Sequence, residues 1–218
     1  MSKVVVFGAA GFAEVVHFYL THDSEHDVVA FTVNASHRKN DTFAGLPLVD
    51  FERVHELYPP ESHKMFIAAG YRNLNQIRAR LCDEARARGY QLITYVSSKA
   101  TVWTDKIGDN CFIFEHNVIQ PFTTIGNDVI LWSGNHIGHH STIGDHCFIS
   151  SHVVVSGHVK VGPYCFIGVN VSIRDTIEIG ESCLIGAGAV IMRNTKPREV
   201  YVAERTKAHA LPSDKFPF

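Results

Sequence analysis

The fold is decided by residues 107–191, which read IGDNCF-IFEHNV-IQPFTT-IGNDVI-LWSGNH-IGHHST-IGDHCF-ISSHVV-VSGHVK-VGPYCF-IGVNVS-IRDTIE-IGESCL-IGAGAV-I. An aliphatic residue occupies every sixth position from Ile107 to Ile191 without a break, 15 times in all. Four positions later most hexads carry a small or β-branched residue, as at Cys111, Val129 and Ser141. A period of six fits neither a helix nor a long alternating strand. It predicts short strands joined by sharp corners, with both of these positions pointing inward.

Three such hexads return the chain to its starting face, so we expect coils of three hexads stacked about 4.8 Å apart. The cysteines agree with this interpretation, since the members of one set recur at whole multiples of this coil length: Cys111, Cys147, Cys165 and Cys183. They are therefore expected to stack on one inner face. With no CxxC pair in the chain, they are expected to be small buried hydrophobic residues rather than disulfides or zinc ligands.

Histidine is frequent in this chain, at 14 residues. Five histidines share the second corner position of their hexads: His116, His140, His146, His152 and His158. That position is expected to need a left-handed backbone, for which His is enriched alongside Asn and Asp. His136 and His139 do not share this position, so they stay candidates for chemistry.

The N-terminal third follows a different pattern. A buried-strand run, Lys3–Phe7, leads into the turn Gly8-Ala9-Ala10-Gly11, and a helical pattern covers Phe12–Leu20. Further strands are expected over residues 28–33, 64–69 and 90–96, with an amphipathic helix over 74–88 that ends at Gly89 as its C-cap. This alternation of strand and helix predicts a small parallel α/β unit.

Two glycine turns in this unit are candidate ligand-binding loops. The first, Gly8 to Gly11, could present backbone N–H groups to a phosphate, or it could be a tight turn with no ligand. It reads GxxG and not GxGxxG, so a single nucleotide diphosphate fits better than a dinucleotide. The second, Ala69 to Asn73, is expected at the same carboxyl edge of the sheet, where Arg72 could pair with a phosphate.

Charge and hydropathy limit the classes of partner. The 20 basic and 22 acidic residues give a formal net charge of −2, which implies no attraction to nucleic acid or to an anionic membrane. No apolar run reaches the roughly 18 residues of a membrane span, and the first ten residues lack the features of a secretory signal. We therefore expect a soluble cytoplasmic protein.

The two modules together resemble the bacterial hexapeptide-repeat sugar acyltransferases, in particular the branch called sialic acid O-acetyltransferase NeuD-like. The resemblance rests on Phe7 to Gly11, on Ala69-Gly70 with Arg72, and on the repeat itself. It implies an α/β N-terminal Rossmann-like domain followed by a left-handed parallel β-helix. It also implies a homotrimer, with acetyl-CoA bound in the cleft between neighbouring helices.

The domain division that follows is a nucleotide-sugar-binding α/β domain over 1–98, a β-helix acyltransferase domain over 99–196 and a tail over 197–218. The resemblance implies acetyl-CoA-dependent N-acetylation of a dTDP-, UDP- or GDP-linked amino-deoxy sugar, for biosynthesis of a surface glycan such as lipopolysaccharide or O-antigen. O-acetylation of a sugar hydroxyl is the alternative. A non-catalytic β-helix and a metal-dependent hydratase are more distant ones. His116 and His152 have the hydratase spacing, but Gly157 stands at the third ligand position, so no metal is expected.

The resemblance also assigns residues. His139 matches the general base, and an imidazole has a pKa near working pH. Gly157 would offer its N–H to the thioester carbonyl, and Ala187 and Gly188 would contact the cofactor two coils beyond His139. The nucleotide sugar would lie against a larger set: Gly8, Ala9, Ala10, Gly11, Phe12, Gly70, Arg72 and Trp132.

Three departures from the family pattern accompany these assignments. Phe12 follows Gly11 where the family commonly has histidine, His140 stands where an acid often follows the base, and Trp132 replaces a small polar residue. His136 is the rival base, since it is expected to point outward from a strand. The carboxylate that orients the base is left open among three residues: Glu115, Asp128 and Asp145.

Overall fold

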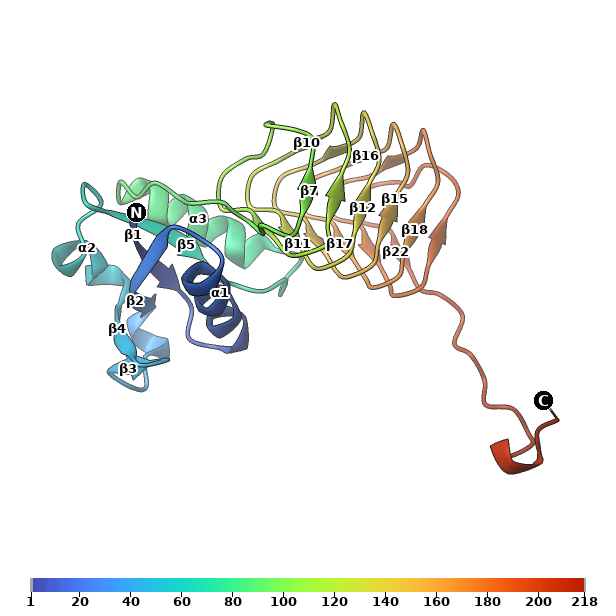
Figure 1. Cartoon of the computed structure of the whole chain (residues 1–218), viewed down its shortest axis with the longest axis horizontal. Coiled ribbons are helices and arrows are strands. Elements are labelled where there is room, and N and C mark those ends of the chain that lie inside the picture. The colour runs from blue at the N-terminus through green and yellow to red at the C-terminus, as the bar shows by residue number, and fades with distance from the viewer. Residues whose placement is uncertain (1, 218) are drawn as a thin grey trace.

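The computed structural model describes residues 2–217, which form an α/β domain and a long prism of stacked coils (Figure 1). The prism has the stacked coils that the hexads predicted and is the left-handed parallel β-helix that the family resemblance implied, and the α/β domain packs against its first coils. Ala203 still packs against the prism core, and after it the chain leaves the prism as an exposed segment (Figure 1).

The α/β domain is built on a five-stranded sheet in the order β3-β4-β2-β1-β5. Its strands are β1 (Ser2–Phe7), β2 (His26–Val33), β3 (Thr42–Phe43), β4 (Leu46–Asp50) and β5 (His63–Ile67). The four strands β1, β2, β4 and β5 are parallel, which confirms the predicted α/β unit. The antiparallel hairpin of β3 and β4 was not predicted, because these two strands are too short to show an alternation.

Helices cover both faces of this sheet. Helix α1 (Gly11–His22) shares a core with Val4, Val6 and Phe31, whereas α3 (Gln76–Ala87) packs with Val5 and Ile67 on the opposite face. A short helix, α2 (Val54–Leu57), follows the 3-10 turn Phe51–Arg53, and two further 3-10 turns cover Ala35–His37 and Ser213–Lys215.

Helix α3 begins two residues later than predicted. Three consecutive residues before it have positive φ, 53° at Asn73, 45° at Leu74 and 64° at Asn75, and a left-handed backbone cannot continue into an α-helix. The predicted end is confirmed, since Gly89 has φ of 89° and its N–H donates to the Arg86 carbonyl.

The prism has three faces, which we name by their surroundings. The docked face lies against the α/β domain and contains β6 (Tyr95–Val96), β8 (Phe112–Ile113), β11 (Ile130–Leu131), β14 (Phe148–Ile149), β17 (Phe166–Ile167), β20 (Leu184–Ile185) and β22 (Val200–Tyr201). The middle face contains β7 (Thr101–Val102), β9 (Val118–Ile119), β12 (His136–Ile137), β15 (Val154–Val155), β18 (Ser172–Ile173) and β21 (Val190–Ile191). The polar face contains β10 (Thr124–Ile125), β13 (Thr142–Ile143), β16 (Lys160–Val161) and β19 (Glu178–Ile179).

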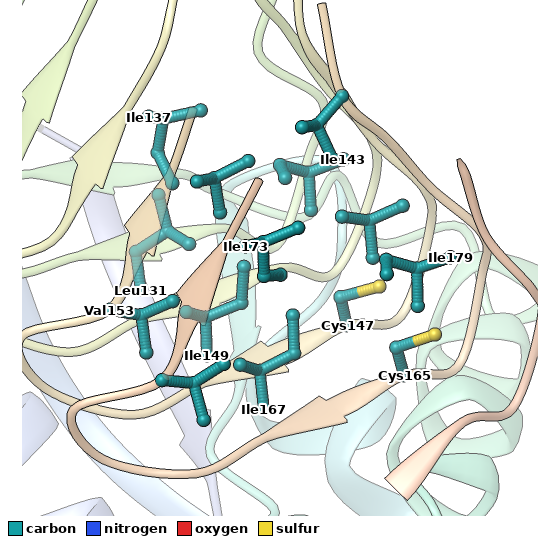
Figure 2. Packing of buried hydrophobic residues seen from close by; sticks show 14 of the residues in the cluster. Leu131, Ile137, Ile143, Cys147, Ile149, Val153, Cys165, Ile167, Ile173 and Ile179 are labelled. Carbon is teal, nitrogen blue, oxygen red and sulfur yellow. The ribbon is translucent and has the colours of Figure 1, made fainter. Parts of the chain in front are cut away.

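The interior of the prism is the predicted aliphatic ladder. Fourteen of the 15 hexad aliphatics are buried and Ile107, the first, packs against them; several line the interior in Figure 2. The four stacked cysteines are buried free thiols, as predicted. Burying each of the hexad aliphatic side chains stabilises the fold by about 1.5–3 kcal/mol, so the repeat supplies most of the driving force for folding of the prism.

The corners are also as predicted. All five histidines at the second corner position have a left-handed backbone, with φ between 57° and 60°. The histidine-rich composition therefore follows in part from backbone geometry.

The two halves share one apolar core. Phe112 and Phe148 project outward from the docked face and pack in the same cluster as Val4 and Leu20. The predicted strand over residues 90–96 is divided between the halves: Leu92 pairs with Met65 of β5, whereas β6 pairs with β8 of the prism. At the other end the coils extend further than expected, because β22 pairs with β20. Within residues 2–217 no helix combines the length and apolarity that crossing a membrane requires.

Candidate functional site

His139 and Gly157 lie together at the corner between the middle and polar faces. The imidazole of His139 covers Gly157, one coil further on: a Cβ on Gly157 would lie 2.8 Å from His139 Cε1 and 2.9 Å from its Nε2. His139 is exposed to solvent and Gly157 is half-buried. Gly157 has no side chain at a point where the ring needs the space, so the corner places an imidazole directly against a glycine.

The N–H groups at the third position of a hexad are of two kinds, and those of Ser151, Gly157 and Val169 have no acceptor among residues 2–217. The N–H groups of Asp109, Asn127 and His139, each third in its hexad, donate to side-chain oxygens of neighbouring coils, at 2.7–3.1 Å. Among residues 2–217 no group accepts a hydrogen bond from the N–H of Gly157. It is therefore a free donor beside an exposed imidazole.

None of the three candidate carboxylates contacts His139 or His136. Asp145 accepts hydrogen bonds from Asn127, at 2.7 Å from its backbone N–H. Glu115 accepts from the hydroxyls of Tyr19 and Ser133, at 2.8 and 2.9 Å. Burial and the hydrogen bond to Glu115 raise the pKa of Tyr19 to about 12. The imidazole of His139 instead has a second imidazole as its polar partner, with His139 Nδ1 at 3.1 Å from His140 Nδ1.

Asp128, the third candidate, belongs to a different corner. It is fully buried and accepts from Arg78 Nε at 2.8 Å, and His146 Nδ1 lies 2.9 Å from its other oxygen. Burial alone would raise the pKa of Asp128, but the charge of Arg78 and the hydrogen bonds from His146 and Asn110 hold it below its usual value. Asp128 therefore fixes the α/β domain to the prism and does not orient the candidate base.

The remaining β-helix candidates lie on the middle face or at its other edge. His136 lies on β12 and points outward, half-buried, between Val118 and Val154 of the neighbouring strands. Ala187 and Gly188 lie at the corner between the docked and middle faces, and not two coils beyond His139 as expected. The residue two coils beyond His139 is Asp175. Within one chain the middle face therefore separates Ala187 and Gly188 from His139 and Gly157.

The glycine turns meet at one edge of the α/β sheet, as predicted. Gly8 has φ of 134° and approaches the next strand so closely that a Cβ would lie 2.9 Å from the Ala68 carbonyl oxygen. Gly11 starts α1, and no side chain caps that helix, so the N–H groups of its first turn remain available. Gly70 and Arg72 are exposed in the second turn, and Ala9, Ala10 and Phe12 complete the first.

Trp132 extends this region onto the prism. Its indole stacks on Phe114 with ring centroids 4.4 Å apart, and its centroid lies 6.1 Å from that of Phe12. A cavity of about 240 Å³ opens between the second glycine turn and the docked face, lined by Tyr71, Trp132, Phe148, Ser150, Ser151 and Val169. Tyr71 was not among the predicted residues. The outward phenylalanines of the docked face, which recur at whole multiples of one coil, were the signal for a docking partner on that face.

Residues 122–157 and 158–193 match the sequence model of a family described as bacterial transferase hexapeptide (six repeats). This match confirms the predicted hexapeptide repeat over a third of the chain. No curated protein sequence matches the chain.

Solved structures match almost the whole chain. The chain is similar to PerB from Caulobacter crescentus, crystallised with CoA and GDP-perosamine, at 24% identity and a TM-score of 0.78, covering 92% of this chain and 93% of PerB. It is also similar to the acetyltransferase domain of PglB from Neisseria gonorrhoeae, at 23% identity, a TM-score of 0.75 and coverage of 89% and 93%. WeeI from Acinetobacter baumannii matches at 18% identity and a TM-score of 0.68, with coverage of 90% and 94%. These similarities establish a shared fold over both domains.

Proposed function

We propose that this protein transfers the acetyl group of acetyl-CoA to the amino group of a nucleotide-linked amino-deoxy sugar. The fold shared with PerB and with a perosamine N-acetyltransferase from the same organism supports this, because both were crystallised with CoA and GDP-perosamine. Two structures of that N-acetyltransferase carry a histidine replaced by asparagine or by alanine. The same histidine was thus replaced in both structures, in a protein that shares this fold.

The observation that carries the proposal is the contact between His139 and Gly157. Acyl transfer to an amine needs a base for the proton of the attacking nitrogen and a donor for the oxyanion that forms on the carbonyl. The exposed imidazole and the free N–H of Gly157 supply one of each, with the ring lying against the glycine. No protein nucleophile is required, since the thioester is already activated.

In this scheme the sugar nitrogen attacks the thioester carbonyl carbon while His139 accepts a proton from the nitrogen. The N–H of Gly157 donates to the carbonyl oxygen as negative charge develops there. The carbon–sulfur bond then breaks, and the proton held by His139 passes to the departing sulfur of CoA. The products are the N-acetyl sugar and CoA, with His139 neutral again. A positioned base contributes typically 10²- to 10⁴-fold to such a step.

The nucleotide diphosphate is assigned to the edge where the two glycine turns meet. The uncapped start of α1 provides backbone donors and the positive end of a helix dipole, which favour an anion. Arg72 adds an exposed guanidinium, and the cavity beside Trp132 offers an aromatic wall to a base or sugar ring. Gly8, Ala9, Ala10, Gly11 and Phe12 would form the floor of this subsite.

A homotrimer would complete this site. Trp132 and His139 stand at opposite edges of the middle face, so one chain does not bring the nucleotide subsite to its own base. A neighbouring protomer would supply His139 and Gly157 across the interface. We further propose that Ala187 and Gly188 line the acetyl-CoA cleft and that His136 positions substrate. The activity would serve surface glycan biosynthesis, such as lipopolysaccharide or O-antigen, in the cytoplasm.

The function is tested by incubating the protein with acetyl-CoA and a panel of UDP-, dTDP- and GDP-linked amino sugars. We expect release of the CoA thiol and the mass gain of one acetyl group with at least one amino sugar. The matched sugar carrying a hydroxyl in place of the amine should give neither product. Acetylation of that hydroxyl sugar at an equal rate would instead make the protein an O-acetyltransferase, and no turnover with any member would oppose the proposal.

The nucleotide subsite is tested by Gly11→Phe. A Cβ at Gly11 would meet nothing within 4 Å, the φ of Gly11 is not left-handed and the residue is exposed, so the variant should fold. It should raise the KM for the nucleotide sugar roughly tenfold or more by obstructing the helix start, and leave the KM for acetyl-CoA nearly unchanged. Equal increases in both KM values would contradict the assignment.

A further inference from the structure

Three imidazoles converge on the outside of the corner between the middle and polar faces: those of His139, His140 and His158. His139 and His140 are adjacent in sequence, and His158 stands one coil beyond His140 at the same left-handed position. The rings of His140 and His158 stack with centroids 4.8 Å apart, and the ring of His139 meets that of His158 edge-on at 5.0 Å. One nitrogen from each ring lies within 4.8 Å of the other two.

This spacing is close to what a single metal ion requires. Zn–N bonds are about 2.0–2.1 Å long, so two imidazole nitrogens on one ion lie roughly 3–3.5 Å apart. The Nδ1 atoms of His139 and His140 are already 3.1 Å apart. The rings of His140 and His158 are stacked 15° from parallel, so the His158 ring has to leave this stack to bring its nitrogen to the same distance, and the exposure of all three side chains leaves room for that movement.

The surroundings favour a metal over a structural role for these rings. No carboxylate between residues 2 and 217 forms an ion pair with any of the three. By contrast His146, at the same hexad position as His140 and His158, is held by Asp128 at 2.9 Å. The three exposed imidazoles form a nitrogen-only donor set with a fourth position open to water.

We propose that His139, His140 and His158 bind a divalent first-row transition ion, with Zn²⁺ as the expected occupant. Imidazole suits Zn²⁺, Ni²⁺ and Cu²⁺, whereas Mg²⁺ and Ca²⁺ prefer oxygen ligands, which this cluster lacks. The sequence did not predict this site, because His139 and His140 acquire their third partner only when the next coil brings His158 alongside.

A bound ion would inhibit the reaction assigned to this corner, and this consequence rests on the proposed function. A nitrogen of His139 that is bonded to the metal cannot accept a proton from the substrate amine. We therefore expect Zn²⁺ to lower the acetyl-transfer rate reversibly, with recovery when a chelator is added.

The binding test uses His158→Asn, which removes one ligand and keeps a residue that tolerates the left-handed backbone. The matched control is His152→Asn, an exposed histidine at the same hexad position of another corner, with φ of 59°. Each purified full-length protein is titrated with Co²⁺, whose visible absorption reports nitrogen coordination, and then with Zn²⁺ in competition. His140→Asn is a second ligand variant in a different coil, and melting temperatures in chelator establish that every variant is folded.

We expect wild type and His152→Asn to bind one Co²⁺ per chain with equal affinity, and to release it to Zn²⁺. His158→Asn and His140→Asn should each bind at least tenfold more weakly. Equal Co²⁺ affinity in wild type and both ligand variants, or no Co²⁺ spectrum in wild type, would overturn the site. Binding without inhibition by Zn²⁺ would keep the metal site and remove His139 from the proposed chemistry, so the two proposals fail separately.

Discussion

Two corners of the prism carry histidine at the same backbone position, but the contacts of the imidazole differ between them. At the corner between the polar and docked faces, His146 is bound to Asp128, which is bound in turn to Arg78 of α3. At the corner between the middle and polar faces, the side chains of His140 and His158 lie against aromatic rings and the neighbouring imidazoles and form no ion pair among residues 2–217, and His139 beside them is exposed.

The difference lies in what covers each corner. Helix α3 covers the first, and its fully buried Arg78 also donates to the carbonyl oxygens of Asp128 and Cys147. No helix between residues 2 and 217 is packed against the second, so its imidazoles are free to react. The repeat thus places histidines at equivalent backbone positions, and contacts from the α/β domain determine which of them stabilise the fold.

The largest expected effect comes from opening the covered corner. Arg78→Ala leaves the carboxylate of Asp128 buried without its partner, which should lower the free energy of unfolding by about 3–5 kcal/mol. Arg80→Ala, on the exposed side of the same helix, removes only a surface ion pair with Glu84 and should cost less than about 1 kcal/mol. Urea denaturation of both variants measures the contrast, and similar losses would mean that the buried pair does not join the domains.

A smaller effect is expected from Asp128→Asn, with a defined pH dependence. The folded-state pKa of Asp128 lies below its ordinary value of 3.8, so its ionised form stabilises the fold above that pH. This contribution is lost as the pH falls from 3.8 through the lower folded-state pKa. We expect Asp128→Asn to be about 2 kcal/mol less stable than wild type at neutral pH.

The deficit of Asp128→Asn should shrink in acid, because below about pH 3.8 the unfolded wild-type chain binds a proton at Asp128 before the folded protein does. The measurement is the free energy of unfolding of both proteins from pH 7 down to pH 3. A deficit that stays constant over this range would show that the pKa of Asp128 is the same in the folded and unfolded protein, which contradicts the stabilisation of its ionised form by Arg78.

Substitutions at the exposed corner are expected to change the rate of acetyl transfer rather than the stability of the fold. In Gly157→Ala the new methyl group would lie within 3 Å of the His139 ring, which can move because it is a side chain at the surface. The base would then be displaced from the free N–H, and kcat/KM should fall at least tenfold, which corresponds to about 1.4 kcal/mol. Ser156→Ala, at the neighbouring residue, should keep the wild-type rate, and both proteins should have wild-type melting temperatures. A wild-type rate in Gly157→Ala would separate this glycine from the chemistry.

The sequence predicted the prism well because every hexad repeats the same pattern, so each one indicates an inward side chain and a corner by itself. Inward aliphatics, the stacked thiols of Cys147 and Cys165 and the left-handed corners all follow from a period of six. The α/β domain was less predictable. The hairpin of β3 and β4 depends on a tight turn at Ala44 and Gly45, both with positive φ, and its strands are too short to show a period.

The sequence could predict those contacts of the candidate site that follow from the spacing of the repeat. It could not predict the contacts that form only when the α/β domain packs against the prism. The repeat itself places Gly157 one coil beyond His139, against the imidazole ring. The partner of Asp128 could not be predicted, because Arg78 reaches it from a helix 50 residues away in sequence. The same limit applies to Tyr71, which reaches Phe148 only because the two domains pack together.

The central claim is that His139 serves chemistry whereas His146, at an equivalent corner, serves the fold. The most direct test measures two quantities, kcat/KM for acetyl transfer and the free energy of unfolding, on His139→Ala and His146→Ala. We predict that His139→Ala loses roughly 10²-fold or more in kcat/KM and keeps the stability of wild type. His146→Ala should lose about 1–3 kcal/mol of stability and keep the rate. A large rate loss in both variants, or in neither, would contradict the claim.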